Sequence, residues 1–410
     1  MTEESAEKAP DVDVVICGGG VAGLWTLNHL INKGYHVILV EKNRLGEGQT
    51  IKCQGIIHGG GKYALKENLR LDSVREIREM PARWRKHLSG EASPDLSGVR
   101  LLSDYCYLWI SNDRGFLGHA SALISKAGVK LLSTKPIEVN DAPAFLKDNA
   151  RIVYKLGEPT IDTYSLLKEL AKPYPERIIY GSILAVELEK DFLRSVTIET
   201  ETAEKIQMKA KAVILTAGKG NAELAKMMGI AEEIMQERPL RQVLVQGGNL
   251  PELYAHCIDS GTTDISITTH YGQDGSRAWN IGGKVAEKGP SMNPEELIRK
   301  VKEELGRVLK TVDLTGTTWS TFDATRAELK TNDGTRPGGV EIYTKKNIII
   351  GWPTKLALAP ILAEELEREL IDKRIYPISA LDVPIKPRGD RIHSLELNSL
   401  KQKIAQAPWG

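Results

Sequence analysis

Cysteine is scarce in this chain, and its shortage argues against two kinds of scaffold. The four cysteines lie far apart and form no C-x-x-C pair, which argues against a structural zinc site and against a disulfide framework. Such usage is typical of a reducing compartment. Long apolar runs are also absent, since no uncharged run approaches the roughly 20 residues of a membrane-spanning helix. We therefore expect a cytoplasmic protein with no metal site and no integral membrane segment.

A large excess of either charge is missing too. The chain carries 55 basic and 54 acidic side chains among its 410 residues, so nothing predicts a nucleic-acid-binding surface. The first ten residues are polar and acidic, unlike a secretory signal or a transit peptide, and we expect them to be disordered. The length suits two interleaved domains better than one simple domain.

Glycine, by contrast, is plentiful and is concentrated in one informative place. An apolar run, Val12 to Cys17, leads into Gly18, Gly20 and Gly23, which match the pattern G-x-G-x-x-G. Apolar residues at helical spacing follow, and a second apolar run ends in Glu41. Strand, glycine turn, helix, strand and acid in this order predict a Rossmann-like dinucleotide-binding unit.

Each glycine of the turn has a physical reason. The first allows a tight turn, the second lets the backbone approach a pyrophosphate, and the third lets helix and strand pack closely. The first helical residues, Val21 and Ala22, present N–H groups to the phosphates. Glu41 lies 18 residues after Gly23, where a carboxylate accepts hydrogen bonds from the adenosine ribose. The alternative is a plain βαβ crossover, and the motif alone does not choose between FAD and NAD.

The segment after Glu41 points to FAD. Residues 49–60 read QTIKCQGIIHGG, which is a Q-T-x-x-x-x-G-x-I-H-x-G arrangement. It resembles the FAD-dependent oxidoreductases of the D-amino-acid oxidase superfamily, which includes glycine oxidase, glycerol-3-phosphate dehydrogenase and L-2-hydroxyglutarate dehydrogenase, and it is most similar to the last branch. The resemblance implies FAD as the cofactor, with Lys42, Gln49 and Thr50 among its contacts. It also implies that this loop runs from the pyrophosphate to the isoalloxazine ring.

A segment in the middle of the chain resembles the same family. Residues 209–218 read as a strand that ends in a small-residue turn at Ala217 and Gly218. The family has a similar segment where the chain returns to the FAD domain. In that comparison Ile183 falls where the family binds adenine through backbone groups.

A third segment resembles the family but departs from it in one turn. A strand ending at Gly351 and a helix from Leu356 are similar to the elements that bring a helix N-terminus to the flavin pyrimidine edge, where its dipole stabilises negative charge. The family has a glycine-rich turn between them, whereas this chain has Pro353, Thr354 and Lys355. The resemblance would place the cation of Lys355 near the ring, where it would raise the flavin potential or assist catalysis. A lysine that points into solvent is the alternative.

The pattern as a whole predicts an α/β fold in which a Rossmann-like FAD-binding domain is combined with a discontinuous, β-rich substrate domain of the α+β type. We expect the FAD-binding domain to comprise residues 11–95, 154–235 and 320–375, and the substrate domain residues 96–153 and 236–319. Residues 376–410 are expected to form an irregular tail on the surface. The expected helices are 62–90, 162–171, 222–228, 294–309 and 356–370. The expected later strands are 99–102, 105–110, 130–132, 177–188, 195–199, 206–215, 242–246, 265–270, 278–282 and 347–351.

Histidines are the candidates for a base that accepts a substrate proton. His58 lies in the flavin loop and is our first choice, although a flavin contact or a covalent tether are also open to it. His270 and Tyr271 end a predicted strand of the substrate domain, which makes His270 the second choice and Tyr271 a substrate contact. His256 is expected to be a surface or core residue. Cys53 could be reactive, but a small buried loop residue is the more ordinary interpretation.

Arginines are the candidates for a clamp on an anionic substrate, because a guanidinium meets a carboxylate with two parallel hydrogen bonds. The resemblance favours Arg326, in the segment before the last flavin strand. Arg241 and Arg336 come next. Each alone is more often a partner in an ordinary surface salt bridge.

These observations predict an FAD-dependent dehydrogenase or oxidase. It would oxidise a CH–OH or CH–NH bond of a small polar, anionic substrate by hydride transfer to flavin N5. The electron acceptor is left open among oxygen, a quinone and a partner flavoprotein. The alternatives are an NAD(P)-dependent reductase and a non-catalytic flavin-binding subunit.

Overall fold

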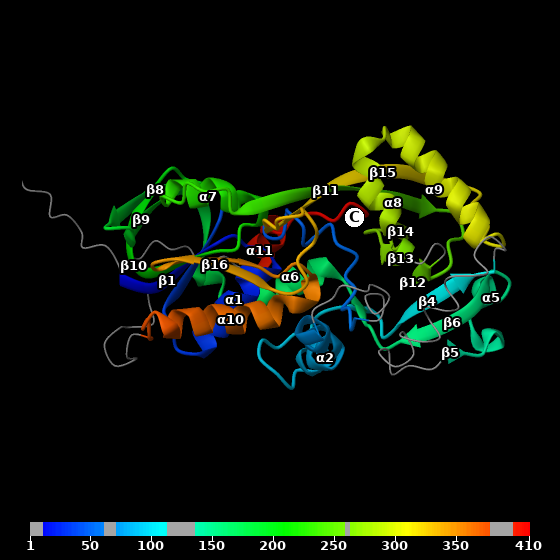
Figure 1. The fold of residues 1–410 in the computed structure, drawn as a ribbon, viewed down its shortest axis with the longest axis horizontal. Helices are drawn as coiled ribbons and strands as arrows, with labels where there is room; N and C mark the ends of the chain where they lie inside the picture. The colour runs from blue at the N-terminus through cyan, green and yellow to red at the C-terminus, as the bar shows by residue number, and fades with distance from the viewer. Residues whose placement is uncertain (1–10, 61–70, 113–135, 259–262, 378–396) are drawn as a thin grey trace, which may run out of the picture.

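The structure, a computed structural model, describes residues 11–60, 71–112, 136–258, 263–377 and 397–410. Its secondary structure is arranged around two large sheets that lie side by side along the long axis of the molecule (Figure 1). The predicted disordered lead at residues 1–10, the start of the helix predicted from residue 62 and the strand predicted at 130–132 fall outside the described residues.

The first sheet contains the glycine turn. Its seven strands are ordered β1-β2-β8-β9-β10-β17-β16, with β1 also paired to β10. β1, β2, the start of β8, β10 and β17 pair in parallel, while β8, β9 and β10 form an antiparallel excursion. Strands buried on both faces read as continuous apolar runs, which is why the segments leading to Cys17 and Glu41 were recognisable. The strands are β1 Asp11–Cys17, β2 Val37–Glu41, β8 Ile178–Glu189, β9 Phe192–Thr200, β10 Lys205–Leu215, β16 Glu341–Lys345 and β17 Ile348–Trp352.

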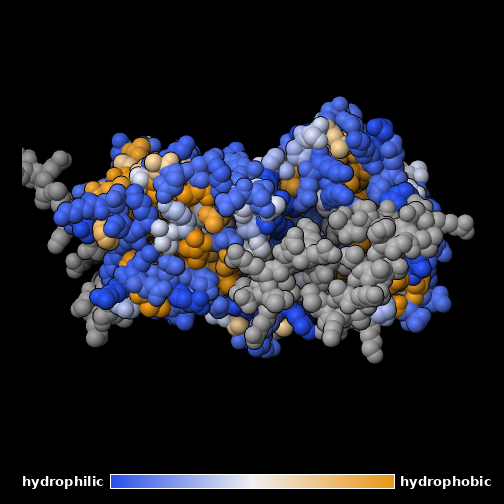
Figure 2. Space-filling view, in the orientation of Figure 1, coloured by the Kyte–Doolittle hydropathy of each residue, from blue (hydrophilic) through white to orange (hydrophobic). Residues whose placement is uncertain are grey.

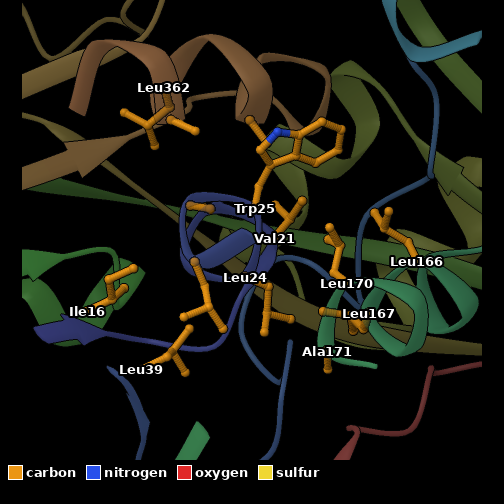
Figure 3. Packing of buried hydrophobic residues seen from close by; sticks show 14 of the residues in the cluster. Ile16, Val21, Leu24, Trp25, Leu39, Leu166, Leu167, Leu170, Ala171 and Leu362 are labelled. Atoms are coloured by element: carbon orange, nitrogen blue, oxygen red, sulfur yellow. The ribbon is translucent and has the colours of Figure 1, made fainter. Parts of the chain in front are cut away.

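One face of this sheet is covered by three helices, α1 Val21–Asn32, α6 Thr163–Ala171 and α10 Ala359–Asp372 (Figure 1). Trp25 of α1 lies toward Leu362 of α10, and Leu166 and Leu170 of α6 lie on the other side of α1 (Figure 3). Asn28 joins α1 to α6, because its amide donates to the carbonyl oxygen of Leu170 at 2.7 Å. The packing of α6 and α10 against α1 therefore fixes the position of α1 on the sheet.

Trp25 gives a stability test of this core. Its side chain is 1% exposed, and its ring lies 4.8 Å from that of Trp84 in α2 Leu71–Leu88. Trp25→Ala is expected to lower the free energy of unfolding by about 3–5 kcal/mol, as other large-to-small changes of buried aromatic residues do. Urea denaturation followed by circular dichroism measures it. Phe192→Ala, at a site that is 41% exposed, is the control, and a loss for Trp25→Ala no larger than the control's would contradict the packing described.

The second sheet has eight strands in the order β15-β11-β14-β13-β12-β4-β6-β5. Two of them, β11 Met235–Gly247 and β15 Thr317–Leu329, pair along their whole length. They extend from the half of the molecule that holds the seven-stranded sheet, called the first half here, into the half that holds the eight-stranded sheet, called the second half (Figure 1). The other strands are β4 Cys106–Ser111, β5 Pro136–Ile137, β6 Ala150–Leu156, β12 Tyr254–Ile258, β13 Thr263–Tyr271 and β14 Arg277–Gly282. The remaining elements include β3 Leu101–Ser103, β7 Thr160–Ile161, α5 Ala144–Lys147, α7 Asn221–Met227, α8 Lys284–Lys288, α9 Pro294–Val308 and α11 Leu397–Lys403.

The two faces of the second sheet differ in polarity. On one face Val243, Trp279 and Ile281 pack in a core cluster with Leu297 and Val301 of α9. Successive side chains of a strand point to opposite faces, so the intervening residues face the other way. These are largely polar, and among them are Gln242, Ser266, Thr268, His270, His256 and Asn280, all buried. A buried polar face is costly unless its groups are hydrogen-bonded, so this face marks where a site lies.

The surface in view is largely hydrophilic, and hydrophobic residues show mainly over the half that holds the seven-stranded sheet (Figure 2). Leu184, Phe192, Ile371 and Tyr376 are exposed and belong to that half. None of the described helices is long and apolar enough to cross a membrane.

Three of the predicted domain boundaries cut through strands. The boundary at 153/154 divides β6, which pairs with β4 from Leu156 to Ala150. The boundaries at 235/236 and 319/320 fall within β11 and β15, the long strands shared by both halves.

Two strands were not predicted from the sequence. β12 was not predicted because polar His256 interrupts its sequence YAHCI, and β15 was not predicted because its sequence alternates polar residues with small ones.

The predicted surface position of the C-terminal tail is wrong for several residues near its end. After α11, Ile404 is fully buried and forms a bridge with Leu45. Trp409 is 3% exposed and stacks on His270, with 3.8 Å between ring centroids. This segment is held by its apolar residues, because Ile404, Ala405 and Trp409 are each buried against another part of the chain.

Candidate functional site

The glycine turn joins β1 to α1 and leaves almost no space beside its backbone. Gly18 has a φ of +108°, and a Cβ there would lie 2.5 Å from Cα of Ala217. A Cβ on Gly23 would lie 1.9 Å from the carbonyl oxygen of Gly18. The first and third glycines are therefore required by the close approach of β1, α1 and the end of β10. Gly20 is less confined, since its Cβ would be 3.3 Å from Oγ1 of Thr50.

Glu41 lies at the end of β2 and faces this turn. Its Oε2 accepts a hydrogen bond from the N–H of Gly19 at 2.6 Å, and its Oε1 accepts one from Asn43 at 2.8 Å. Burial raises the pKa of Glu41, while the hydrogen bonds from Asn43 and Gly19 act in the opposite direction. The carboxylate is thus fixed beside the turn, and its binding of ribose hydroxyls stays a prediction. Lys42 follows it and is exposed.

The loop after Glu41 is tied to the start of α1. Oγ1 of Thr50 accepts a hydrogen bond from the N–H of Val21 at 3.1 Å. Nε2 of Gln49 lies 3.9 Å from the position that a Cβ on Gly218 would take. The structure therefore brings together Gln49, Thr50, Val21 and Gly218, next to the C-terminal ends of β1 and β10.

Ile183 and Gly351 occupy two separate strands, β8 and β17, of the same sheet. Ile183 is 8% exposed and packs in the core cluster that contains Val40 of β2. Gly351 is in β17, where a Cβ would lie 3.0 Å from Leu362 of α10. Leu356 begins a short 3-10 helix, Leu356–Leu358, that leads directly into α10.

Lys355 does not point into solvent. It is 7% exposed, and its Nζ donates to the carbonyl oxygen of Gly338 at 2.6 Å. The neighbouring Thr354 adopts a φ of +55° and donates from Oγ1 to the carbonyl oxygen of Gly339 at 2.7 Å. The departure from a glycine-rich turn is therefore stabilised by hydrogen bonds to the segment 338–339.

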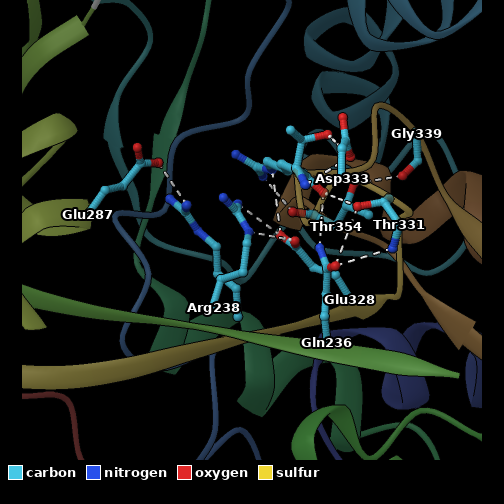
Figure 4. Close-up of polar contacts among 11 residues, drawn as sticks. Gln236, Arg238, Glu287, Glu328, Thr331, Asp333, Gly339 and Thr354 are labelled. Atoms are coloured by element: carbon cyan, nitrogen blue, oxygen red, sulfur yellow. Dashed lines mark hydrogen bonds and ion pairs between the residues drawn. The ribbon is translucent and has the colours of Figure 1, made fainter. Parts of the chain in front are cut away.

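A group of charged side chains lies on β11 and β15 beside this turn (Figure 4). Arg238 makes two hydrogen bonds to Glu328, at 2.8 and 3.3 Å, and Glu328 is 1% exposed. Nε of Arg336 lies 3.9 Å from the same carboxylate, and its NH2 donates to the carbonyl oxygen of Thr354 at 2.5 Å. Arg326 donates to Glu287 of α8 at 2.9 Å. Three guanidinium groups here face two carboxylates, which leaves one net positive charge among these five side chains.

Two of the predicted clamp residues, Arg326 and Arg241, lie on opposite faces of the β11–β15 strand pair. Arg326 is directly opposite Arg238 in the β11–β15 pairing, and burial and the nearby charges of Arg336 and Arg238 lower its pKa. Arg241 lies on the other face of the strand pair, because it is three positions after Arg238 and successive side chains of a strand alternate between faces. It makes two hydrogen bonds to Asp323, at 2.7 and 3.1 Å, and one to the carbonyl oxygen of Met292. Arg241 is therefore engaged in a structural contact.

The loop 49–60 crosses the polar face of the second sheet. The amide of Gln242 donates to the carbonyl oxygen of Lys52 at 3.0 Å. The amide of Gln54 donates to the carbonyl oxygens of Ser266 and Asn280 at 3.0 and 2.9 Å. A Cβ on Gly282 would lie 3.0 Å from Oε1 of Gln54. The loop 49–60 of the first half is therefore bound directly to the polar face of the second half.

His58, at the end of this loop, meets Glu158, which the sequence did not single out, and His256, which was expected to be a surface or core residue and is fully buried. Its Nδ1 lies 3.3 Å from Oε2 of Glu158, and its ring lies 5.5 Å from that of His256. Glu158 follows β6 and His256 is in β12, so both partners are about 100 or more residues away along the chain. No sequence signal linked the three, because only the tertiary fold brings them together.

His270 lies on the same face but is a weak base. It is 1% exposed, and its Nε2 is 2.9 Å from Oγ1 of Thr268. Burial lowers the pKa of His270 to about 3, so the ring is neutral and binds a proton poorly near pH 7. Tyr271 is held at the edge of the sheet by a hydrogen bond to Glu252 and by the guanidinium of Arg100, 4.5 Å from its ring centroid.

Cys53 is not a reactive thiol. Burial raises its pKa to about 11, which keeps the sulfur protonated near pH 7, whereas the thiolate is the reactive form.

Comparison with known proteins gives consistent results. A family model described as FAD dependent oxidoreductase matches residues 13–345. A Pseudomonas aeruginosa protein named probable FAD-dependent oxidoreductase is 35% identical over 385 residues, which cover 93% of this chain and 96% of that protein. The crystal structure of an FAD dependent oxidoreductase from the same organism matches with a TM-score of 0.78 at 32% identity, over 98% of both chains.

More distant structures share the fold. Glycine oxidase from Geobacillus kaustophilus has a TM-score of 0.64 at 13% identity, over 91% of this chain and 96% of its own. L-alpha-glycerophosphate oxidase from Mycoplasma pneumoniae, solved with FAD bound, has a TM-score of 0.65 at 16% identity, over 88% of this chain and 95% of its own.

Proposed function

Since the chain belongs to the FAD dependent oxidoreductase family, we propose that it oxidises a CH–OH or CH–NH bond of a small anionic substrate by hydride transfer to N5 of its FAD. The described residues fit this cofactor. The turn at Gly18 and Gly23 leaves a bare backbone beside the first turn of α1, which suits a pyrophosphate. The buried carboxylate of Glu41 suits the ribose hydroxyls, and Gln49 and Thr50 follow on the path of the loop.

The positive charge of the arginine group carries the proposal of an anionic substrate. Arg238, Arg326 and Arg336 together exceed the charge of Glu287 and Glu328 by one. Each of the three arginine side chains is about a quarter exposed, and excess positive charge in such a partly buried place is costly unless an anion approaches. Arg326 is the best candidate clamp, because its partner Glu287 is half-exposed and can turn to solvent when a substrate carboxylate or phosphate replaces it.

A second observation supports a small polar substrate. Asn280 is fully buried, and within the part of the chain that the structure describes neither polar atom of its amide has a hydrogen-bond partner. It lies on β14 between Gly282, which faces Gln54, and Ala278, which packs against Trp409. An unpartnered amide on the polar face is suited to a bound hydroxyl, amine or carboxylate group.

For the base we retain His58 rather than His270. His58 belongs to the loop that links the cofactor turn to the polar face, and its partner Glu158 favours the protonated ring. His270 has a pKa of about 3, which makes it a poor acceptor. Lys355 remains a candidate for an electrostatic role at the closing turn, with its ammonium group already bound by the carbonyl of Gly338.

One preparation tests the proposal. Purified protein saturated with FAD should be mixed anaerobically with a panel of 2-hydroxy acids, amino acids and glycerol phosphate, while the flavin absorbance is followed. We expect bleaching by members of one anionic class and none by their uncharged analogues. Reoxidation by oxygen, a soluble quinone or a partner flavoprotein then identifies the acceptor. Equal bleaching by charged and neutral analogues would refute the anionic preference, and bleaching by none would refute the proposed reaction.

A further inference from the structure

Three titratable side chains from distant parts of the chain meet beside the loop 49–60. They are His58, Glu158 and His256, and their atoms that can carry a proton or ligate a metal lie within 4.8 Å of one another. His58 is part of the loop, Glu158 lies between β6 and β7, and His256 belongs to the polar face of the second sheet.

Glu158 is fixed in place by the backbone next to His58. It is 3% exposed, and its Oε1 accepts a hydrogen bond from the N–H of Gly59 at 2.8 Å. Its Oε2 lies 3.3 Å from Nδ1 of His58. One carboxylate therefore contacts two successive residues of the loop, and this sets the direction of the imidazole ring. A buried carboxylate also favours a positively charged partner.

The surrounding elements hold the carboxylate in this position. Pro81 of α2 packs against Gly59, because a Cβ there would lie 2.9 Å from its ring. Arg85 of α2 donates to the carbonyl oxygen of Gly157 at 3.1 Å and so fixes the residue before Glu158. Arg85 is thus a charged side chain that α2 brings to this segment.

His256 completes the group from the opposite side. It is fully buried, and its Nδ1 lies 2.6 Å from Oγ of Ser266. Its ring is 5.5 Å from the ring of His58, at an interplanar angle of 33°. Two imidazolium ions at this separation repel each other, so protonation of one ring opposes protonation of the other. The group is therefore suited to take up one proton.

We propose that Glu158 is a positioning residue that orients His58, and that His58 and His256 together hold the proton that the substrate releases. The proposal rests on the proposed function. In the reaction the C–H bond of the substrate breaks and its hydride passes to FAD. The proton of the adjacent hydroxyl or ammonium group passes to His58, and a carbonyl group or an iminium ion forms. Glu158 stabilises the imidazolium that results, in the same way that a carboxylate supports other general-base histidines.

Glu158→Gln in the FAD-loaded full-length protein is the first test, because glutamine keeps the shape of the side chain and removes its charge. We expect the limiting rate of anaerobic flavin reduction near pH 7 to fall about 10–100-fold, which is a part of the roughly 10²–10⁴-fold that general-base catalysis contributes. The acidic limb of the pH–rate profile should move to lower pH, since the carboxylate no longer favours the charged imidazole. FAD affinity and the dissociation constant of the substrate should change less than about twofold, because both groups bind elsewhere.

Two further variants make the result specific. Glu158→Asp keeps the charge and is expected to restore part of the rate and the wild-type position of the profile. It also replaces Glu158→Gln if that variant does not fold. Glu169→Gln is the matched control, because Glu169 is also buried but pairs with Lys172 on α6, and it should leave the profile unchanged.

A measurement without substrate separates this proposal from the proposed function. The imidazole nitrogens of His58 can be followed by NMR during a pH titration of the FAD-loaded protein and assigned by their loss in His58→Asn. Glu158→Gln should lower the titration midpoint of His58 by about one pH unit or more. An unchanged midpoint overturns the proposal, whether or not a substrate is found. Stoichiometric zinc in the purified protein, with a rate that chelation abolishes, also overturns it, because the three residues would then be metal ligands.

Discussion

Gly23→Ala is expected to give a folded protein that binds FAD at least about 100-fold more weakly than the wild type. A single methyl group at this position would lie 1.9 Å from the carbonyl oxygen of Gly18. Gly18 cannot move away, because it is itself confined by the backbone of Ala217. The start of α1 must therefore shift, and its N–H groups lose their alignment with the pyrophosphate. A 100-fold loss corresponds to about 2.7 kcal/mol of binding free energy.

Titration of the apoprotein with FAD, followed by the quenching of flavin fluorescence, measures this effect. Circular dichroism of the apoprotein shows whether the fold is retained. Gly48→Ala is the matched control, since nothing lies within 4 Å of the added Cβ in the same loop region. Equal FAD affinity in the two variants would mean that the close contact of β1 and α1 is not what shapes the cofactor site.

Arg326→Met is expected to raise the dissociation constant of the substrate about 100-fold and to leave FAD affinity nearly unchanged. The variant removes the guanidinium that faces the site but keeps much of the apolar stem, so packing is largely preserved. Charge-assisted hydrogen bonds of a buried guanidinium to an anion are worth a few kcal/mol. The half-exposed Glu287 can be hydrated in the variant, which limits the loss of stability.

The rate of anaerobic flavin reduction as a function of substrate concentration gives this constant directly. Arg326→Lys keeps the charge without the planar fork and should lie between the wild type and Arg326→Met. Arg241→Met removes an arginine from the other face of the same strand pair, where it bonds to Asp323, and should alter stability rather than substrate affinity. The clamp belongs elsewhere if Arg241→Met weakens substrate binding as much as Arg326→Met does.

The cofactor half of the site could be predicted from the sequence because its information is local. Gly18, Gly23 and Glu41 occur within one short stretch, and strand, turn and helix fix their relative positions through backbone geometry alone. Thr50 and Gln49 follow directly in the same loop. The family match then decides for FAD over NAD and for an enzyme over a non-catalytic subunit.

The substrate half could be predicted only in part, because its geometry depends on long-range pairing. Arg326 was found through resemblance, but its separation from Arg241 follows from the register of β11 with β15. His256 gave no signal, since an isolated histidine in a short apolar run has many ordinary explanations. Glu158 gave none either, because its partners His58 and Gly59 lie 99 or more residues away. The pKa of His270 depends on burial that the tail provides, through Trp409.

The segment 397–410 has a consequence for proteolysis. Residues 403–405 bond to Leu45 of the first half, and Trp409 covers His270 of the second. One short segment therefore contacts both halves of the molecule, so its detachment would uncover His270 and release Leu45 in a single step.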